Sequence, residues 1–433
     1  MTPDTPSALV PTLRFPEFAN DGPWEAKPLD DVCERLTETV GDFQLTPVSI
    51  SAGKGFVPQA EKFGRDISGS QYSKYIWLQH GDFAYNRGNS KRFPQGCVYR
   101  LTEFDEAAAS SAFHCFRLHD HCEPAFFLGF FENNGHGRQL RRHITSGARS
   151  NGLLNISAET FFGITIPTPR AMDEQRKIAD CLGSLDGLIA AESRKLEALR
   201  KHKEGLMAQL FPQGDESVPR LRFPEFQYAG HWGREPLSEL CDIKHGYAFD
   251  GEFFSDEGKY VLLTPGNFYE RGGYRDRGEK QKYYTGEIPR DYVLNRGDLL
   301  VAMTEQAAGL LGSSILVPDS DKFLHNQRLG LVMKKLGVAW SNEFFFYVFN
   351  TPPVREGIHG SASGMKVRHT SPTKIGQVVV SFPASLSEQQ RVADCLSALD
   401  ARIAAQTRKL DALKQHKQGL LQQLFPSLEG EAQ

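Results

Sequence analysis

The chain has 433 residues, of which 40% are hydrophobic and 24% charged, a composition typical of globular proteins and one that predicts two or three domains rather than a disordered chain. It contains no apolar run of about 18 residues and no basic start followed by an apolar stretch, so we expect neither a membrane span nor a secretory signal. The net charge of −3 excludes a uniformly basic nucleic-acid binder, so that any DNA-binding surface must be local.

The first element in the chain is a short anchor segment that occurs twice. Its sequence, Val-Pro-Thr-Leu-Arg-Phe-Pro-Glu-Phe at residues 10–18, returns with one substitution at residues 218–226. The same offset of 208 residues carries Trp24 onto Trp232 and Cys33 onto Cys241. A repeat of this kind indicates a tandem duplication.

The segment after the first anchor, roughly residues 34–160, has no clear relative in the second half, where roughly residues 242–374 take its place. Tyr75–Asn86 reads as two strands around a Gly81-Asp82 turn, which predicts a hairpin. Arginine and lysine beside glycine and serine suit contacts with phosphates and guanine. We therefore predict that this segment contacts DNA through Arg87, Lys91, Arg92, Arg138, Arg141, Arg142 and Arg149.

Histidines and cysteines cluster between residues 114 and 122, as His114-Cys115, His119 and His121-Cys122. These residue types bind zinc, but the spacing fits no common zinc pattern and the second half has no counterpart. Buried strand residues are the interpretation we favour, and a metal site stays the alternative. The seven scattered cysteines are an odd number, which predicts a reducing compartment, the cytoplasm, rather than a disulfide framework.

A long helix follows each variable segment. From Ile178 to Leu210, and again from Val392 to Leu424, apolar residues recur at alternating spacings of four and three, the seam of a coiled coil. Between Glu174–Pro212 and Glu388–Pro426, 24 of 39 positions are identical. Each helix would be roughly 37 residues and about 55 Å long. We expect them to pair antiparallel within the chain, the alternatives being packing on one globular domain or pairing with another protein.

Polar residues interrupt both seams at matching positions, Glu192 and Lys203 in the first and Gln406 and Lys417 in the second. Such interruptions cost stability but fix register. Asp173 is the predicted cap of the first helix, and Ser387 with Gln390 the predicted capping box of the second.

The second variable segment repeats the Gly-Asp turn at Gly297-Asp298 and ends, like the first, in a loop of glycine and basic residues. Its predicted DNA-binding residues are Lys280, Lys282, Lys366 and Arg368. The predicted boundaries are 10–170 for the first domain, 171–212 for the central helix, 218–384 for the second domain and 385–426 for the distal helix.

Sequence motifs for catalysis are missing. Gly53-Lys54-Gly55 lacks the spacing of a phosphate-binding loop, and Asn350-Thr-Pro-Pro has the wrong order for an amino-methyltransferase motif. No glycine-rich loop after a strand offers a place for S-adenosylmethionine. The chain is therefore predicted to bind rather than to catalyse.

Taken together, Leu-Arg-Phe-Pro-Glu-Phe with a tryptophan a few residues later, the Gly-Asp turn, and Glu-Gln before a leucine-rich helix resemble the specificity subunits of type I restriction–modification systems. The resemblance covers both copies and almost the whole chain. It implies an α+β fold with two mixed α/β target-recognition domains, separated by an antiparallel pair of long coiled-coil helices with internal pseudo-twofold symmetry. Each domain would read one half of a bipartite site in double-stranded DNA, and the helices would set the gap between half-sites.

The resemblance also implies partners: two methyltransferase subunits and two motor-nuclease (restriction) subunits, in a system of DNA methylation and phage defence. S-adenosylmethionine, ATP and Mg²⁺ would bind to those partners, with no cofactor on this chain. A coiled-coil scaffold that binds proteins without reading DNA, or an enzyme with its active site around His114–Cys122, remains an alternative.

Overall fold

The computed structural model describes residues 9–51, 53–88, 93–144, 153–305, 309–364 and 367–428. The chain divides into two compact units: the first unit comprises Met1–Arg194 with Thr407–Gln433, and the second Lys195–Gln406. Two continuous helices, α5 (Met172–Leu210) and α10 (Leu386–Leu424), each contribute one stretch to both units. None of the helices in the described ranges is long and apolar enough to cross a membrane.

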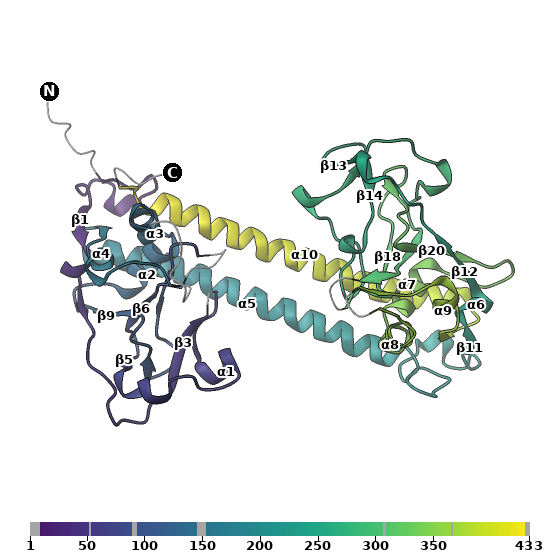
Figure 1. Cartoon of the computed structure of the whole chain (residues 1–433), viewed down its shortest axis with the longest axis horizontal. Coiled ribbons are helices and arrows are strands. Elements are labelled where there is room, and N and C mark those ends of the chain that lie inside the picture. Colours follow the sequence, from purple (N-terminus) through teal and green to yellow (C-terminus); the bar gives the residue numbers. More distant parts are fainter. Residues whose placement is uncertain are drawn as a thin grey trace. The chain divides into compact units, whose positions relative to one another are not determined.

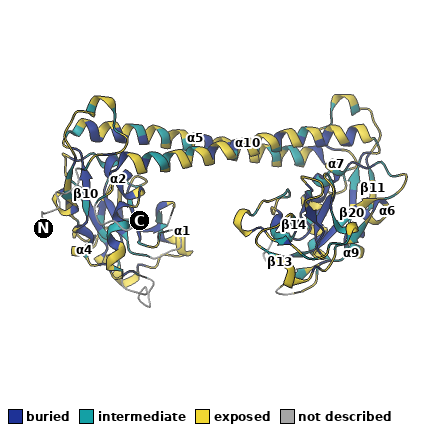
Figure 2. Cartoon of the chain, turned by 90° about the horizontal axis from the view of Figure 1, so that it is seen from above, coloured by how far each residue is buried: buried dark blue, intermediate teal, exposed yellow. Residues whose placement is uncertain are grey.

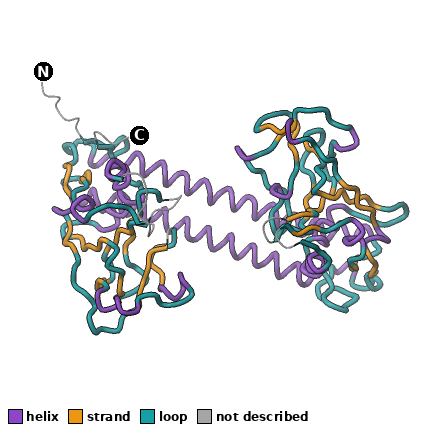
Figure 3. The backbone as a smooth tube through the Cα atoms, in the orientation of Figure 1, coloured by secondary structure: helices purple, strands orange, loops and turns teal. Residues whose placement is uncertain are grey.

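The first unit is a mixed α/β structure of strands and short helices (Figure 3). Its two four-stranded sheets have the orders β2-β9-β6-β7 and β4-β3-β8-β5, and β1 pairs with β10. The strands are β1 (Glu25–Pro28), β2 (Cys33–Arg35), β3 (Pro47–Ser51), β4 (Gly55–Pro58), β5 (Ile76–Gln79), β6 (Phe83–Asn86), β7 (Cys97–Arg100), β8 (Glu106–Ala109), β9 (His114–Leu118) and β10 (Thr165–Thr168). The helices before α5 are α1 (Gln59–Phe63), α2 (Pro124–Glu132), α3 (Gly135–Leu140) and α4 (Ala158–Phe162), with 3-10 turns at Pro16–Phe18, Leu29–Asp31, Gly69–Lys74 and Arg141–His143.

The second unit repeats this plan although the two variable segments share no clear sequence similarity (Figure 1). Its main sheet, β12-β20-β16-β18, has the chain order and antiparallel pairing of β2-β9-β6-β7. The strands are β11 (Gly233–Pro236), β12 (Cys241–His245), β13 (Phe254–Ser255), β14 (Tyr260–Leu262), β15 (Tyr283–Tyr284), β16 (Leu299–Ala302), β17 (Thr304–Glu305), β18 (Ser314–Leu316), β19 (Phe323–Leu324), β20 (Leu329–Lys334), β21 (Arg368–His369) and β22 (Val379–Phe382). The helices are α6 (Leu237–Leu240), α7 (Asn342–Phe349), α8 (Pro352–Gly360) and α9 (Pro372–Gly376), with 3-10 turns at Pro224–Phe226, Gly251–Phe253, Pro265–Asn267, Gly278–Lys280 and Arg290–Tyr292.

The other four-stranded sheet of the second unit has the order β13-β15-β14-β19. Like its counterpart in the first unit it contains one parallel pair, β14 with β19, which corresponds to β3 with β8. The two-stranded pairs β1-β10 and β11-β22 are antiparallel and occupy the same place in the chain order. The duplication therefore extends through the segments whose sequences have diverged, because the pattern of strand pairing is kept while the side chains are not.

The anchors are held by one buried carboxylate in each unit. Arg14 donates two hydrogen bonds to Glu174, Nε to Oε1 at 2.7 Å and Nη2 to Oε2 at 2.8 Å, and the indole of Trp24 donates to the same carboxylate at 3.1 Å. In the second unit Arg222 and Trp232 make the same three bonds to Glu388 at the same distances. The anchors thus lie against the helices, as the resemblance implied.

The glutamine that follows each of these glutamates ties the helix to the aromatic helix of its unit. Gln175 Oε1 accepts a hydrogen bond from the backbone N–H of Glu123, which caps α2, at 3.0 Å. Gln389 Oε1 accepts from the backbone N–H of Ser341, which caps α7, at 2.9 Å. The repeated Glu-Gln pair is therefore a structural joint between the long helix, the anchor and the α/β domain of its unit.

An aromatic trio packs beside each joint. In the first unit the rings of Trp24, Phe126 and Phe425 lie 5.1–6.3 Å apart. In the second unit Trp232, Phe344 and Phe211 lie 5.5–6.1 Å apart. Aromatic pairs at such separations add stability beyond the apolar area that they bury. The last residues of α10 thus close the core of the first unit, and those of α5 close the core of the second.

Segments of α5 and α10 pair antiparallel inside each unit. In the first unit Lys417 contacts Asp186, whereas Lys409, which is earlier in α10, contacts Glu192, which is later in α5. In the second unit Lys203 contacts Asp400, and the end of α5 packs with the start of α10. Every predicted seam position is buried or half-buried (Figure 2). The seam prediction and the expected intramolecular pairing are confirmed within each unit.

Two local predictions were wrong. Tyr75–Asn86 is no hairpin: β5 and β6 flank the Gly81-Asp82 turn but belong to different sheets. Asp82 accepts a hydrogen bond from the backbone N–H of Gln79 and binds Arg117 in two-pronged fashion at 2.7 and 2.8 Å, which fixes the turn as a crossing between sheets. Two strands and a turn in sequence do not reveal which partners the strands will choose.

The helix caps were also misplaced. α10 begins at Leu386, and its cap lies two residues before the predicted one: Ser385, not Ser387, accepts a hydrogen bond from the N–H of Glu388. Asp173 lies inside α5, where it forms an ion pair with Arg176. In both cases the helix begins further upstream than the sequence predicted, several residues before the first apolar residue of its seam.

Candidate nucleic-acid interface

In the first unit, two chain segments meet next to the loops that carry three of the predicted DNA-binding residues. Gly88, just after β6, forms an antiparallel bridge with Leu153, and Leu154 N–H donates to the carbonyl of Arg87 at 2.9 Å. The loops that carry Lys91, Arg92 and Arg149 start or end at this bridge, but these three residues lie outside the described residues. The bridge brings together two loops that are more than 50 residues apart in the chain.

The second unit has the same construction. β17 pairs antiparallel with β21, so that Thr304 faces His369 and Glu305 faces Arg368. The loops that follow β17 and precede β21 correspond in chain order to those of the first unit. Lys366 belongs to the second of them and lies outside the described residues. We call this arrangement the loop pair of each unit: residues 88–93 with 144–153 in the first, and 305–309 with 363–368 in the second.

The side chain of Arg87 holds the backbone next to the loop pair of the first unit by hydrogen bonds. Its Nε donates to the carbonyl of Ala112 at 3.0 Å and its Nη1 to that of Ile156 at 3.3 Å. Nε2 of the neighbouring His114 donates to the Ile156 carbonyl at 3.2 Å, and the ring stacks on Tyr85 and Phe161. Burial lowers the pKa of His114, which keeps this ring neutral near pH 7.

In the second unit the support is a buried acid that the sequence did not single out. Glu305 is 4% exposed, and its Oε2 accepts hydrogen bonds from the backbone N–H groups of Gly309, Leu310 and Leu311 at 2.9–3.0 Å. Arg355 donates to the carbonyls of Gly309 and Glu270. Burial lowers the pKa of Arg355, whereas the charge of Glu305 raises it. Charge and hydrogen bonds together fix the backbone next to the loop pair.

The remaining predicted DNA-binding residues occupy different settings. Arg138 on α3 is half-buried and donates to the carbonyl of Asn133 at 2.6 Å, and Arg368 donates to the carbonyl of His359 at 2.8 Å. Arg141 and Arg142 are exposed on the turn that leads toward residue 145, and Lys280 and Lys282 are exposed beside β15. The structure thus brings Arg87 and Arg368 to the bases of the loop pairs and leaves Lys280 and Lys282 on a separate segment.

Glu305 and Arg355 were missed because each is an ordinary charged residue in an unaligned stretch. Asn350, which the sequence suggested only as part of a misordered methyltransferase motif, ends α7 instead. Its amide donates to the carbonyl of Phe346 at 2.8 Å and to the hydroxyl of Ser314 at 2.7 Å. For Glu305, the one signal in the sequence was a glutamate after a buried strand, and this pattern is too common to be specific.

The histidine and cysteine cluster is spread over two sides of a sheet. Cys115 and Cys122 are buried free thiols in different apolar clusters, whereas His119 and His121 are exposed and stack on each other. Burial raises the pKa of the Cys122 thiol to about 11. No group of three or more metal-binding side chains occurs in the part of the chain that the structure describes.

Residues 230–415 match the family model of the type I restriction modification DNA specificity domain. The match covers 186 of the 433 residues, a little under half of the chain. Its matched range contains the loop pair of the second unit and most of α10.

The chain is also similar to two specificity subunits. The specificity subunit of the type I restriction enzyme MjaVIII from Methanocaldococcus jannaschii is 22% identical over 284 residues, which cover 65% of this chain and 66% of that protein. The EcoBI specificity subunit from Escherichia coli is 25% identical over 186 residues, or 42% of this chain and 35% of that protein. The chain therefore spans less than two thirds of the length of either relative.

A solved structure extends the likeness over both units. The type I restriction–modification S subunit from M. genitalium covers 97% of this chain and 100% of its own, with 15% identity and a TM-score of 0.57. At this identity the match concerns the fold, which is α+β with long helices and a repeated domain.

Proposed function

We propose that this chain is the non-catalytic DNA sequence-specificity subunit of a type I restriction–modification complex, and that each unit recognises one half of a bipartite site in double-stranded DNA. The observation that carries the proposal is a repeated framework with different loops. The Arg-Trp-Glu joint is the same in both units to within 0.1 Å in its bond lengths, whereas the loop pairs rest on Arg87 in one unit and on Glu305 in the other.

The difference at the loop pairs suits two targets that are not alike. A protein that bound two copies of one partner would keep the binding loops alike and could let the framework change. Here the opposite holds, which supports recognition of an asymmetric sequence by two unlike readers.

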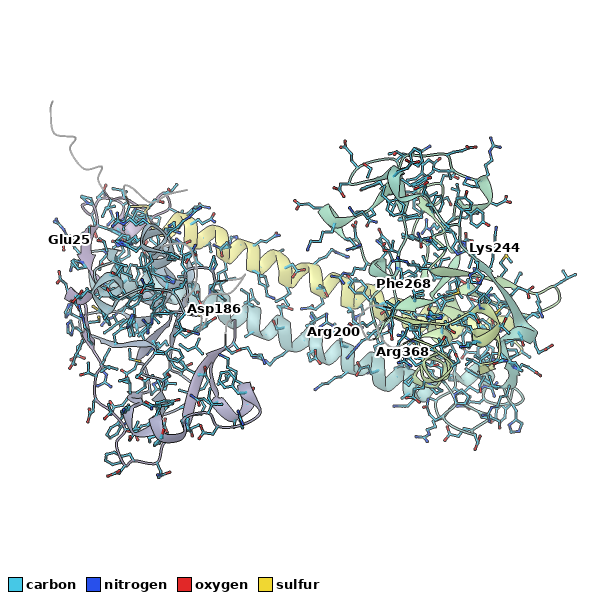
Figure 4. The ribbon with its side chains drawn as sticks, viewed as in Figure 1. Glu25, Asp186, Arg200, Lys244, Phe268 and Arg368 are labelled. Atoms are coloured by element: carbon cyan, nitrogen blue, oxygen red, sulfur yellow. The ribbon has the colours of Figure 1, made fainter. Side chains whose placement is uncertain are left out.

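The proposed partners are those that the family name implies: two methyltransferase subunits that carry S-adenosylmethionine, and two motor-nuclease subunits that use ATP and Mg²⁺, in the cytoplasm. Exposed basic residues on α5 offer a surface for such partners or for solvent, among them Arg194, Lys195, Arg200 and Lys201 (Figure 4 labels Arg200). This chain would contribute position and sequence choice rather than chemistry.

The proposal is tested by mapping methylated adenine in DNA from cells that carry a methyltransferase subunit with or without this chain. We expect a split motif of two short defined sequences around an undefined gap, present only with the chain. Methylation that does not depend on the chain, or a single continuous motif, would refute the proposal, and the latter would favour one reader rather than two.

The role of the helices in setting the gap has its own test. Residues 189–195 and 407–413 are removed together, which deletes both members of the Glu192–Lys409 ion pair and spares the pairs of Lys203 and Lys417. Seven residues of helix are about 10 Å long, close to three base-pair steps. We expect the gap in the methylated motif to shorten; an unchanged gap would rule out helices that set the spacing.

A further inference from the structure

The largest difference between the units is the connection between two paired strands of the second sheet. In the first unit three residues, 52–54, join β3 to β4. In the second unit twenty residues, 263–282, join β14 to β15. This insertion carries Lys280 and Lys282, two of the residues that the sequence predicted to contact DNA. It contains a small hairpin, Phe268–Tyr274, which starts at the labelled Phe268 (Figure 4).

The backbone of the hairpin is fixed from within. Phe268 pairs with Tyr274, and Tyr269 N–H donates to the carbonyl of Gly273 at 3.0 Å. Gly272 and Gly273 have φ angles of +86° and +97°, a region that side chains disfavour. A Cβ atom on Gly272 would also lie 2.2 Å from the amide of Asn350. The turn therefore requires glycine at this position for both conformation and space.

The hairpin is also fixed from outside, by residues at the start of β18 and by Arg355 of α8. Gly273 N–H donates to the carbonyl of Ser314 at 2.9 Å, and the hydroxyl of Ser313 donates to the backbone carbonyl of Tyr269 at 2.7 Å. Arg355 joins the hairpin to the loop pair directly, because its guanidinium donates to the carbonyls of both Glu270 and Gly309. The hairpin is thus tied through one side chain to Gly309, at the described end of the first loop.

The side chains at the tip contrast with this rigid backbone. Tyr269 is 53% exposed, and the guanidinium of Arg275 lies 6.0 Å from the centre of its ring. Arg271 and Arg275 are exposed, and Arg271 also forms an ion pair with Glu204 of α5. A single exposed tyrosine is unremarkable by itself. Here it stands on a locked turn, among basic residues, and next to the loops that differ between the units.

From this placement we propose that the Phe268–Tyr274 hairpin is a specificity-determining element of the second unit, and that the ring of Tyr269 contacts the DNA half-site that this unit reads. Tyrosine offers an apolar ring to a base edge or sugar with little loss of side-chain entropy, since only two torsions must be fixed. The inference rests on the proposed function and adds to it an asymmetry: the first unit, with its three-residue connection, makes no equivalent contact.

The test uses the complex of the full chain with its methyltransferase subunit and three DNA duplexes: one with both half-sites intact, and two with either half-site scrambled. We expect Tyr269→Ala to weaken binding to the intact duplex about tenfold, since good base contacts discriminate by this order. The effect should disappear on the duplex in which the half-site of the second unit is scrambled, and persist on the other. Tyr269→Phe should bind like the wild type, because the ring is retained.

Tyr228→Ala is the matched control, because Tyr228 is 99% exposed in the same unit but lies in the anchor region. It should not alter binding to any duplex, and neither tyrosine variant should shift the unfolding temperature. Equal binding by wild type and Tyr269→Ala, or an equal loss on all three duplexes, would overturn the inference while leaving the proposed function standing. A wild-type complex that does not distinguish intact from scrambled duplexes would instead refute the proposed function.

Discussion

The frameworks of the two units use the same residue types and the same hydrogen bonds, whereas the loops of the two units differ. Arg14, Trp24 and Glu174 are matched bond for bond by Arg222, Trp232 and Glu388. Twenty residues in the second unit replace a three-residue turn in the first. The contrast teaches that contacts which must be satisfied inside a core resist change, whereas exposed loops on the same strands are free to diverge.

The largest expected effect comes from removing the shared carboxylate. Glu174→Ala or Glu388→Ala leaves a nearly buried guanidinium and an indole N–H without their acceptor, and each should lower the free energy of unfolding by about 3–5 kcal/mol. The measurement is urea unfolding followed by circular dichroism. Since the geometry is the same, the two losses should be similar.

The control for this experiment is the neighbouring exposed ion pair of each anchor. Glu17 contacts Lys177 at 3.0 Å, and Glu225 contacts Arg391 at 3.1 Å, with all four side chains about half exposed. Glu17→Ala and Glu225→Ala should leave the unfolding curve unchanged, because solvent screens such pairs. A clear difference between Glu174→Ala and Glu388→Ala would show that the two joints are not equivalent in solution.

A second comparison concerns acid. Each unit buries one histidine whose pKa falls to about 4, His136 in the first and His325 in the second, mainly through burial. Because the folded pKa lies below the ordinary 6.5, protons bind the unfolded state better, and stability present above pH 6.5 is lost as the pH falls toward 4. Each histidine should cost about 2 kcal/mol between pH 7.5 and pH 5.

Replacing these histidines sharpens the comparison. Neither ring nitrogen of His136 has a hydrogen-bond partner among the described residues, so His136→Leu should remove acid sensitivity at little cost near neutral pH. His325 Nε2 is bonded to the Leu329 carbonyl at 2.9 Å, so His325→Leu should lose stability at pH 7.5 as well. Urea midpoints at both pH values measure this. Undiminished acid sensitivity in His136→Leu would place the titrating group elsewhere.

Basic residues provide a comparison of DNA contacts. The pairs Arg141→Ala with Arg142→Ala, and Lys280→Ala with Lys282→Ala, should each weaken binding by the assembled complex. They should also lower the slope of log affinity against log salt by up to about two, one for each lost phosphate contact. Arg220→Ala, an exposed change in the second anchor, is the control. An unaltered slope for either pair would exclude it from the interface.

The smallest effects are expected at the matching lysines of the helix seam. Lys417 contacts Glu132 and Asp186; burial lowers its pKa, but these two carboxylates raise it overall. Lys203 contacts Asp400, which also accepts a hydrogen bond from the hydroxyl of Tyr347. Lys417→Met should cost about 1 kcal/mol in unfolding free energy and Lys203→Met less, because Asp400 retains a partner. The reverse order would contradict this account of the seam.

Sequence by itself determined the elements that depend on repetition and period. The anchors, the two seams with their polar interruptions at Glu192 and Lys203, and the family resemblance all follow from local patterns that recur in one chain. Such patterns can be recognised in the sequence because a helix of 39 residues must repeat its apolar face many times, and a duplicated joint must keep the same residue types.

Tertiary structure alone decided which strands pair and which loops meet. Strand pairing joins residues that are far apart in the chain, as Gly88 meets Leu153 and Glu305 meets Arg368, and no local pattern encodes such a choice. The Gly81-Asp82 turn therefore looked like the turn of a hairpin. In the structure the Asp82 side chain bonds the backbone of Gln79, and β6 belongs to another sheet than β5. The hairpin that presents Tyr269 depends on contacts with Asn350, Ser313 and Arg355, so that its place beside the loop pair exists only once the chain has folded.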